Sequence, residues 1–285
     1  MHNKKLRAWL SLLFLIVGSA CIKETIIKRK NAQAIETVTP LISKTPLPAA
    51  YTTEEFPYEV WERVLREFVD ERGMVDYQRL RDSRADLDLF VAHLNRYSPK
   101  THPAMFPTRE ARLAYYLNAF NTSTFLLVLS RYPLKNIYEM RTEFFVGTVF
   151  VLGGERYTLN SLETMLREEF AEPRVHFVLN CAARGDPRLF QETITPQNTE
   201  AFLEKSARYY HSEPRHVRVV DEKTVELSSM FDLYGDDFLD FLERSGESKP
   251  SLITYINRYR EEKLPEKARI KFVPYNWVPN DQAIP

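Results

Sequence analysis

Apolar side chains recur at intervals of three and four residues over much of the chain, which is typical of helices that bury one face. The clearest stretches predict helices over residues 54–68, 83–98, 108–132, 159–170 and 196–212, with two or three more between 229 and 260. Thr52 or Thr53 is expected to cap the first of these helices. The stretch at 108–132 is the longest and ends before Pro133, so we expect it to form a central helix.

Shorter runs between these helices predict strands and turns. One hairpin is expected at the Gly153-Gly154 pair and another near Glu222-Lys223. Further extended segments are expected at residues 73–80, 175–180 and 268–277. Short strands scattered among many helices favour the α+β class. We therefore expect a single helix-rich domain over residues 53–285 with a small, mostly antiparallel sheet.

Residues 1–21 have the composition of an export signal. Basic residues at Lys4, Lys5 and Arg7 precede an apolar run, and small residues lead from this run to Cys21. The apolar run is shorter than the roughly 20 residues that a bilayer-spanning helix needs. The end of the segment resembles the lipobox of bacterial lipoproteins, although Gly18 stands where leucine is usual. We therefore expect export, with a lipid attached at Cys21.

Residues 22–52 are polar, rich in threonine and punctuated by proline, which predicts a flexible tether. Together with the signal segment, this predicts an exported, membrane-anchored envelope protein: a lipoprotein of the cell membrane or outer membrane that faces the periplasm or the exterior. The membrane itself would then be its first partner. Export without a lipid and a retained signal anchor are the alternatives.

Charge and cysteine content narrow the possible partners and cofactors. The 39 Lys and Arg residues balance the 39 Asp and Glu residues, so no overall field favours nucleic acid as a partner. No His, Cys and carboxylate cluster has metal-ligand spacing, and no phosphate-binding glycine loop is present, so neither a metal nor a cofactor is expected. If Cys21 carries lipid, Cys181 is the single free thiol and no internal disulfide can form.

The central helix carries a polar stripe. Tyr115, Asn118 and Asn121 are three residues apart and therefore share one helix face, which is otherwise apolar. A buried asparagine must be hydrogen-bonded, because an unsatisfied polar group costs about 1–3 kcal/mol. The structural interpretation is that these asparagines hold the backbone of a loop, and this loop could itself line a site.

Cys181 and His176 are the candidates for nucleophilic chemistry. In a strand over residues 175–180, His176 would point away from the side on which Cys181 begins, which weakens the two as a hydrogen-bonded pair, although the turn after Asn180 could reorient the thiol. The remaining candidate bases lie in segments that we expect to be solvated: His93, His102, His211 and His216.

Six motifs occur in an order that resembles a known family. They are YYLNAFN at 115–121, Pro133 to Ile137, TLNSLETMLR at 158–167, RVHFVLNCAARGDPRL at 174–189, SSMFDLYGDDF at 228–238 and YNWVPND at 275–281. Together they are similar to the bacterial and plant domain-of-unknown-function family 547, over residues 54–281. The resemblance implies a fold related to papain-like and transglutaminase-like thiol enzymes, in a family whose members are often exported or lipid-anchored.

The chain departs from this family at two positions. The family has a second cysteine just before the proline, where Asp186 stands here. The family also has a Glu-His pair, whereas here Glu163 is followed by Thr164. If that cysteine and histidine form the active pair, the resemblance implies a pseudoenzyme. We expect Asp186 to pair at the surface with an arginine instead: Arg167, Arg184 or Arg188.

These observations leave three hypotheses about function. The first is a catalytically degenerate protein that binds a peptide-like or cell-wall-like ligand in the former cleft. Residues expected to line this cleft are Tyr115, Asn118, Asn121, Glu163, Arg167, Asn180 and Asp186. The alternative is an active cysteine hydrolase or transferase on peptide or isopeptide bonds, using Cys181 and His176. The third, a purely structural role in the envelope, predicts no polar cleft around Asn118, Glu163 and Asp186.

Overall fold

The computed structural model describes residues 40–285. The expected signal segment, Cys21 and the first part of the expected tether lie outside the described residues. Within residues 40–285, none of the helices combines the length and the apolar character that crossing a membrane requires.

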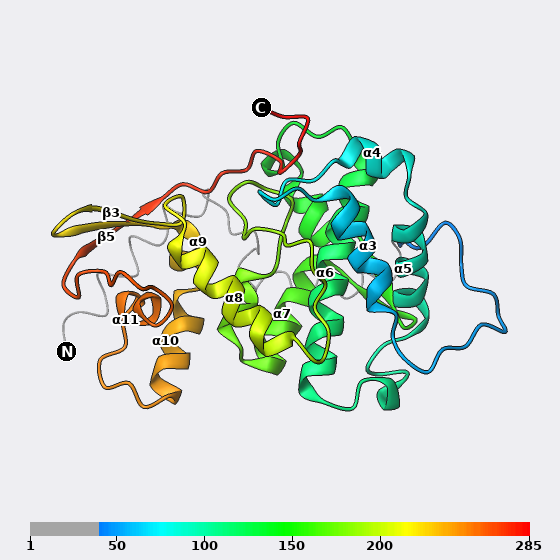
Figure 1. Cartoon of the computed structure of the whole chain (residues 1–285), viewed down its shortest axis with the longest axis horizontal. Helices are drawn as coiled ribbons and strands as arrows, with labels where there is room; N and C mark the ends of the chain where they lie inside the picture. Colours follow the sequence, from blue (N-terminus) through cyan, green and yellow to red (C-terminus); the bar gives the residue numbers. More distant parts are fainter. Residues whose placement is uncertain (1–39) are drawn as a thin grey trace.

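A long central helix organises the first two thirds of the fold (Figure 1). This helix, α6 (Arg109–Arg131), is buried along most of its length, and the Thr108 side chain caps it by accepting a hydrogen bond from the amide of Ala111. The central position expected for it is confirmed. The helices around it are α3 (Tyr58–Phe68), α4 (Tyr77–Asp82), α5 (Ala85–Arg96), α7 (Leu159–Phe170) and α8 (Thr199–Ser212). Four short turns of helix connect them: η1 (Pro103–Met105), η2 (Tyr138–Met140), η3 (Glu143–Gly147) and η4 (Pro173–Phe177).

Two small sheets complete the fold, and both predicted hairpins are confirmed. Strands β1 (Phe150–Leu152) and β2 (Glu155–Tyr157) pair antiparallel around the two glycines. Strands β3 (Val217–Asp221) and β4 (Thr224–Ser228) form the second antiparallel hairpin, and β5 (Arg269–Val273) adds to β4 in parallel. The chain between β4 and β5 forms α9 (Ser229–Leu233), α10 (Gly235–Arg244) and α11 (Leu252–Asn257). The described residues are therefore helix-rich α+β with small sheets.

Three local predictions were wrong. Residues 77–82 form α4, not an extended segment, because the Asp76 side chain accepts the amide of Arg79 and starts a helix there. Residues 173–177 form η4, not a strand, since Pro173 occupies its first turn and the Glu172 side chain accepts the amide of Arg174. Neither Thr52 nor Thr53 caps α3, which begins after Pro57 without a side-chain cap.

The described end of the predicted tether contacts the domain. The amide of Leu41 donates to the carbonyl of Val149 at 2.7 Å, and Leu41 forms a parallel bridge with Phe150. The buried hydroxyl of Ser43 donates to the carbonyl of Asp88 at 2.7 Å. Residues 41–43 therefore pack against the folded chain, ahead of the boundary expected at residue 53.

Buried apolar side chains form two hydrophobic clusters. The first takes its members from the chain between Phe56 and Leu203, around α6. The second contains Phe177 and side chains between Ala207 and Leu264, under the β3–β4–β5 sheet and α9–α11. The candidate site lies where elements of these two clusters meet.

Candidate functional site

The asparagines of α6 hold loops, as the structural interpretation predicted. Asn121 accepts the amide of Asn180 at 2.9 Å and donates to the carbonyl of Val178 at 3.2 Å. Asn118 instead donates to the carbonyl of Ile194 at 2.6 Å. Asn121 therefore positions the turn that carries the cysteine, which we call the cysteine turn (residues 180–186), whereas Asn118 fixes a different loop.

Main-chain amides of the cysteine turn converge on one carboxylate. Oδ2 of Asp186 accepts the amides of Cys181 at 2.8 Å and of Ala183 at 2.7 Å. Between them, Ala182 adopts a left-handed conformation with φ of 66°, and its amide donates to Oδ1 of Asn180 at 2.9 Å. The Asp186 carboxylate therefore occupies two amides of its own turn, as a bound anion would.

The expected surface ion pair of Asp186 was wrong. Asp186 is only 5% exposed, and its second oxygen accepts the hydroxyl of Tyr275, which comes from a segment 89 residues away in sequence. Burial raises the pKa of Asp186 to about 6, although its hydrogen bonds from Tyr275 and the turn amides act in the opposite direction. The side chain serves as the internal acceptor of the turn.

Cys181 lies in this turn with a buried side chain. Burial raises the pKa of its thiol well above the ordinary value, and the charges of Asp186 and Glu163 raise it further. A thiolate is the reactive form of cysteine, so this environment keeps the side chain in its inert protonated form.

His176 is engaged by a different partner. Its Nε2 lies 2.7 Å from Oδ2 of Asp237 on α10, and its ring stacks on Tyr234 at a centroid distance of 3.9 Å. Burial lowers the pKa of His176, while Asp237 acts to raise it. Asp237 is therefore the carboxylate that orients this histidine, and it does so through Nε2. Catalytic histidines are oriented by a third group in a similar way.

Arg167 closes this group from α7. Its guanidinium donates to both oxygens of Asp237, with Nε at 2.7 Å and Nη2 at 2.9 Å. Burial alone would raise the pKa of Asp237, but the bonds from Arg167 and His176 hold it well below its ordinary value. The Arg167–Asp237–His176 group is thus an ion-paired link between α7, η4 and α10.

Glu163 and Tyr234 form a second link between α7 and the end of α9. Tyr234 donates its hydroxyl to Oε1 of Glu163, and both side chains are buried. Burial raises the pKa of Glu163 to about 7, and the charges of Asp237 and Asp186 act in the same direction, against Tyr234 and Arg167. Such values near neutrality are common for groups in functional sites, although buried structural networks also produce them.

The structure brings part of the predicted set together. Glu163, Arg167 and Asp186 lie near Cys181 and His176 in one largely buried group of polar side chains, and Asn180 begins the adjoining cysteine turn. Tyr115 is not part of this group, because its hydroxyl donates to the carbonyl of Tyr97 at 2.8 Å inside an aromatic cluster. Three of the other histidines were expected in solvated segments, and this was wrong, because all three are buried: His93, His211 and His216. His102 is exposed, as expected.

Sequence reasoning missed the side chains that complete the group: Tyr234, Asp237 and Tyr275. A signal for them was present, since the first two lie in the SSMFDLYGDDF motif and the third in YNWVPND. Their role could not be assigned because each one acts on a partner more than sixty residues away.

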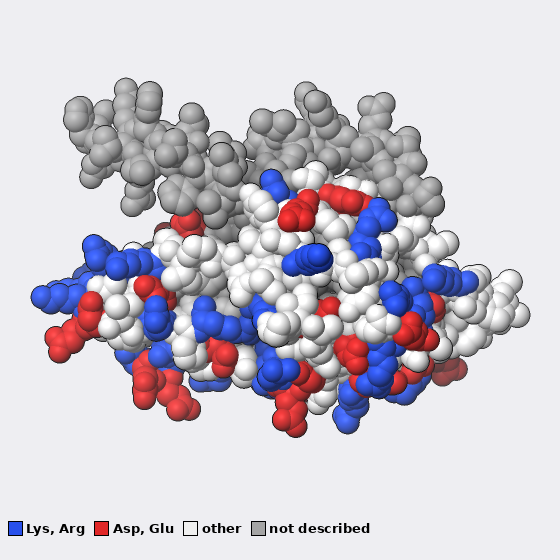
Figure 2. Space-filling model, turned by 90° about the horizontal axis from the view of Figure 1, so that it is seen from above, with Lys and Arg blue, Asp and Glu red and all other residues white. Residues whose placement is uncertain are grey.

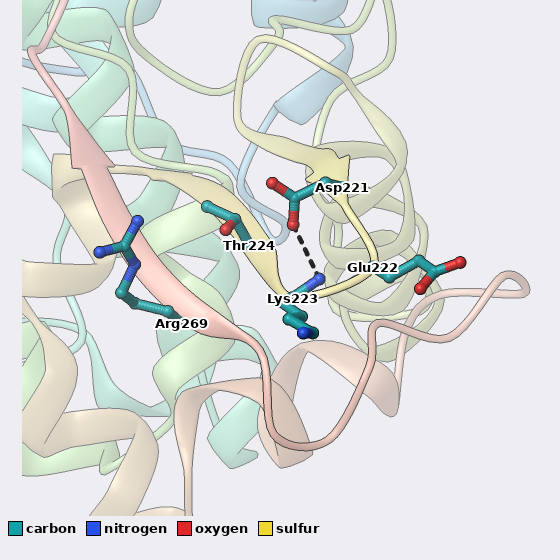
Figure 3. Close-up of a pocket in the computed structure, with 5 residues that line it drawn as sticks. All are labelled: Asp221, Glu222, Lys223, Thr224 and Arg269. Atoms are coloured by element: carbon teal, nitrogen blue, oxygen red, sulfur yellow. Dashed lines mark hydrogen bonds between the residues drawn. The ribbon is translucent and has the colours of Figure 1, made fainter.

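Open pockets lie elsewhere on the described surface. One of about 580 Å³ is lined by residues of the β3–β4 turn together with Arg269 of β5 (Figure 3). A second of about 370 Å³ lies beside Arg218 and Glu226 on the same sheet. The face seen in Figure 2 carries acidic and basic side chains interspersed. Within residues 40–285, no group of three or more His, Cys, Asp or Glu side chains is arranged to hold a metal ion.

Comparison with known proteins matches part of the chain to one family. The model of a family described as "Protein of unknown function, DUF547" covers residues 105–210. These residues form a DUF547 domain. No curated protein and no solved structure matches the chain.

The DUF547 domain spans α6 to α8 and therefore supplies the larger share of the candidate site. Glu163, Arg167, His176, Cys181 and Asp186 all belong to it. The tyrosines and the aspartate that bond to them come from beyond residue 210. The match thus covers only part of the span over which the sequence resembled this family.

Proposed function

We propose that this protein is a catalytically degenerate relative of thiol hydrolases that binds a peptide-like ligand while anchored to a membrane by its N-terminal segment. The observation that carries the proposal is the position of the Asp186 carboxylate. It stands where the family has a cysteine, and it occupies the amides of Cys181 and Ala183 itself. Amides arranged in this way in an enzyme would stabilise the oxyanion of a substrate.

The environment of Cys181 supports the loss of catalysis. Nucleophilic attack requires a thiolate and a base within hydrogen-bonding reach. Here burial raises the pKa of the thiol, and two neighbouring carboxyl groups oppose its ionisation. Nε2 of His176 is engaged by Asp237, which leaves only Nδ1 of this ring to act as a base toward Cys181.

The retained polar group supports a role in binding. Buried ionic and polar side chains often add little net stability relative to well-packed apolar residues. Here they lie near a turn whose amides and carbonyls already bond to an extended segment of the chain. A peptide or a peptide-bearing cell-wall fragment has the same main-chain chemistry, and an exported protein would encounter both. We also take the fold to be of the papain-like or transglutaminase-like kind that the family resemblance implies.

Two measurements on the purified chain from residue 40 onward test the proposal. The first follows hydrolysis of peptide and isopeptide substrates by the wild type and by Cys181→Ala, where we expect no turnover by either protein. The second follows binding of peptides and muropeptides by calorimetry, where we expect saturable binding that Cys181→Ala retains. Turnover that Cys181→Ala abolishes would instead establish the active cysteine hydrolase, and absence of any binding would favour a structural role.

A further inference from the structure

An extended segment of the chain lies over the cysteine turn. After β5, residues 275–279 run back across the molecule toward α4 (Figure 1). The amides of Gly185 and Arg184 donate to the carbonyls of Asn276 at 2.9 Å and Val278 at 2.8 Å. Ala183 and Pro279 form an antiparallel bridge. We call residues 275–279 the strap.

Contact between the strap and the turn is close where the strap begins, at Tyr275 and Asn276. A Cβ atom at Gly185 would lie 2.9 Å from the amide nitrogen of Asn276 and 3.0 Å from the ring of Tyr275, so only glycine allows this approach. The hydroxyl of Tyr275 donates to Asp186. The strap therefore bonds to the turn in the way that a peptide adds a strand to an exposed edge, through main-chain bonds and one anchoring side chain.

The strap is held outside the turn as well, because the carbonyl of Trp277 accepts the amide of Ile137 at 3.1 Å, and both ends of the strap are fixed. On one side it continues from β5, which pairs with β4. On the other side Asn280 is held by α4 and the residues before it: its carbonyl accepts the amide of Val75 at 2.8 Å, and its side chain accepts the hydroxyl of Tyr77 at 2.9 Å. These attachments leave the five residues between them as a loop with fixed ends.

Opening the strap would expose little of the hydrophobic core. Of the five strap residues only Pro279 is buried, whereas Tyr275, Trp277 and Val278 are half-buried and Asn276 is exposed. Beneath the strap, Cys181 and Ala182 are buried. Segments with few buried apolar contacts open at a lower free energy than the whole fold.

We propose that the strap is a detachable cover that occupies, within the chain, the place of an extended peptide on the cysteine turn. A ligand reaches the turn only in a minor state in which residues 275–279 have moved away. The chemistry of that ligand rests on the function proposed above. The opening of the strap is independent of that function, because it is argued from the bonds and the burial of the strap alone.

Labelling of Cys181 in the otherwise native chain tests this proposal. A small disulfide reagent would be applied to the wild type, to Tyr275→Phe and to Gly185→Ala, and the global unfolding rate would be measured on the same proteins. We expect Cys181 to react faster than global unfolding and with a weak dependence on denaturant. Tyr275→Phe removes one hydrogen bond to a carboxylate and should speed labelling roughly tenfold.

Tyr58→Phe is the control, because it also removes a tyrosine hydroxyl that donates a hydrogen bond, here from α3 to the carbonyl of Ala111. It should leave the ratio of labelling rate to unfolding rate unchanged. Labelling that proceeds only at the global unfolding rate, with Tyr275→Phe no faster than the control, would overturn the cover.

A synthetic peptide with the sequence of residues 274–281 separates the two proposals. If Tyr275→Phe speeds the labelling of Cys181 but neither this peptide nor any other binds, the proposal of a cover is retained and the proposal of a peptide-like ligand is contradicted. Absence of opening would contradict the cover, whatever the protein binds.

Discussion

The pKa of Glu163 makes the stability of the fold depend on pH in a way that one substitution should remove. Glu163 is 3% exposed, and burial raises its pKa to about 7 from the 4.5 of an ordinary glutamate. The folded state therefore holds this proton more tightly than the unfolded state. Its stabilising effect is complete below pH 4.5 and is lost as the pH rises through 7. A difference of about 2.5 pKa units corresponds to about 3 kcal/mol of unfolding free energy.

Glu163→Gln replaces the carboxyl by a neutral group that can still accept the hydroxyl of Tyr234. Between pH 4.5 and pH 8, the wild type should lose about 3 kcal/mol of stability relative to this variant. The pKa of Asp186 is also raised, so the protein loses the stabilisation from this second carboxyl group over a lower range of pH. This loss occurs in both proteins and therefore largely cancels in the comparison.

Urea unfolding followed by tryptophan fluorescence at several pH values between 4.5 and 8.5 would measure this difference. Glu169→Gln, on the exposed side of α7, controls for the removal of one negative charge from the same helix. If the stability difference between the wild type and Glu163→Gln stays constant over this range, the glutamate does not hold a proton near neutral pH in the folded protein. The description of the site as a desolvated carboxyl group would then be refuted.

Substitutions at three further positions test other features of the site. Asp186→Ala leaves two turn amides and the hydroxyl of Tyr275 without their acceptor and should cost about 3 kcal/mol or more in thermal or urea unfolding. Asp237→Asn breaks the bidentate bond to Arg167 and should cost about 2 kcal/mol at neutral pH. Because the pKa of Asp237 is depressed, the wild type should lose this advantage as the pH falls below about 4. Ala182→Gly should be tolerated within about 1 kcal/mol, whereas Ala182→Val should destabilise by more, since φ of 66° disfavours a β-branched residue. A valine variant as stable as the glycine variant would contradict the left-handed conformation.

Local patterns were sufficient to predict most of the elements of the fold. The central helix, both hairpins and the late strand follow from hydrophobic periodicity and from glycine or charged turn residues, which act over a few positions in sequence. The errors at Asp76 and Pro173 arose where a single capping side chain or a proline started a helical turn inside an apolar, strand-like run. At these positions local hydrogen bonding outweighed the preference that hydrophobicity alone suggested.

By itself, the sequence determined which polar residues needed partners. Asn121 was expected to be buried and hydrogen-bonded, and Asp186 and the Glu163-Thr164 pair were identified as departures from the family that the sequence resembles. Only the tertiary structure decided what those partners are: the cysteine turn for Asn121, Tyr234 for Glu163, and the turn amides with Tyr275 for Asp186. Burial, which no local pattern measures, then determined that the thiol and both carboxyl groups hold their protons more tightly than in water. The residue types could be read from the sequence. Their chemistry depends on contacts between segments 57 to 89 residues apart, and these contacts exist only once the chain has folded.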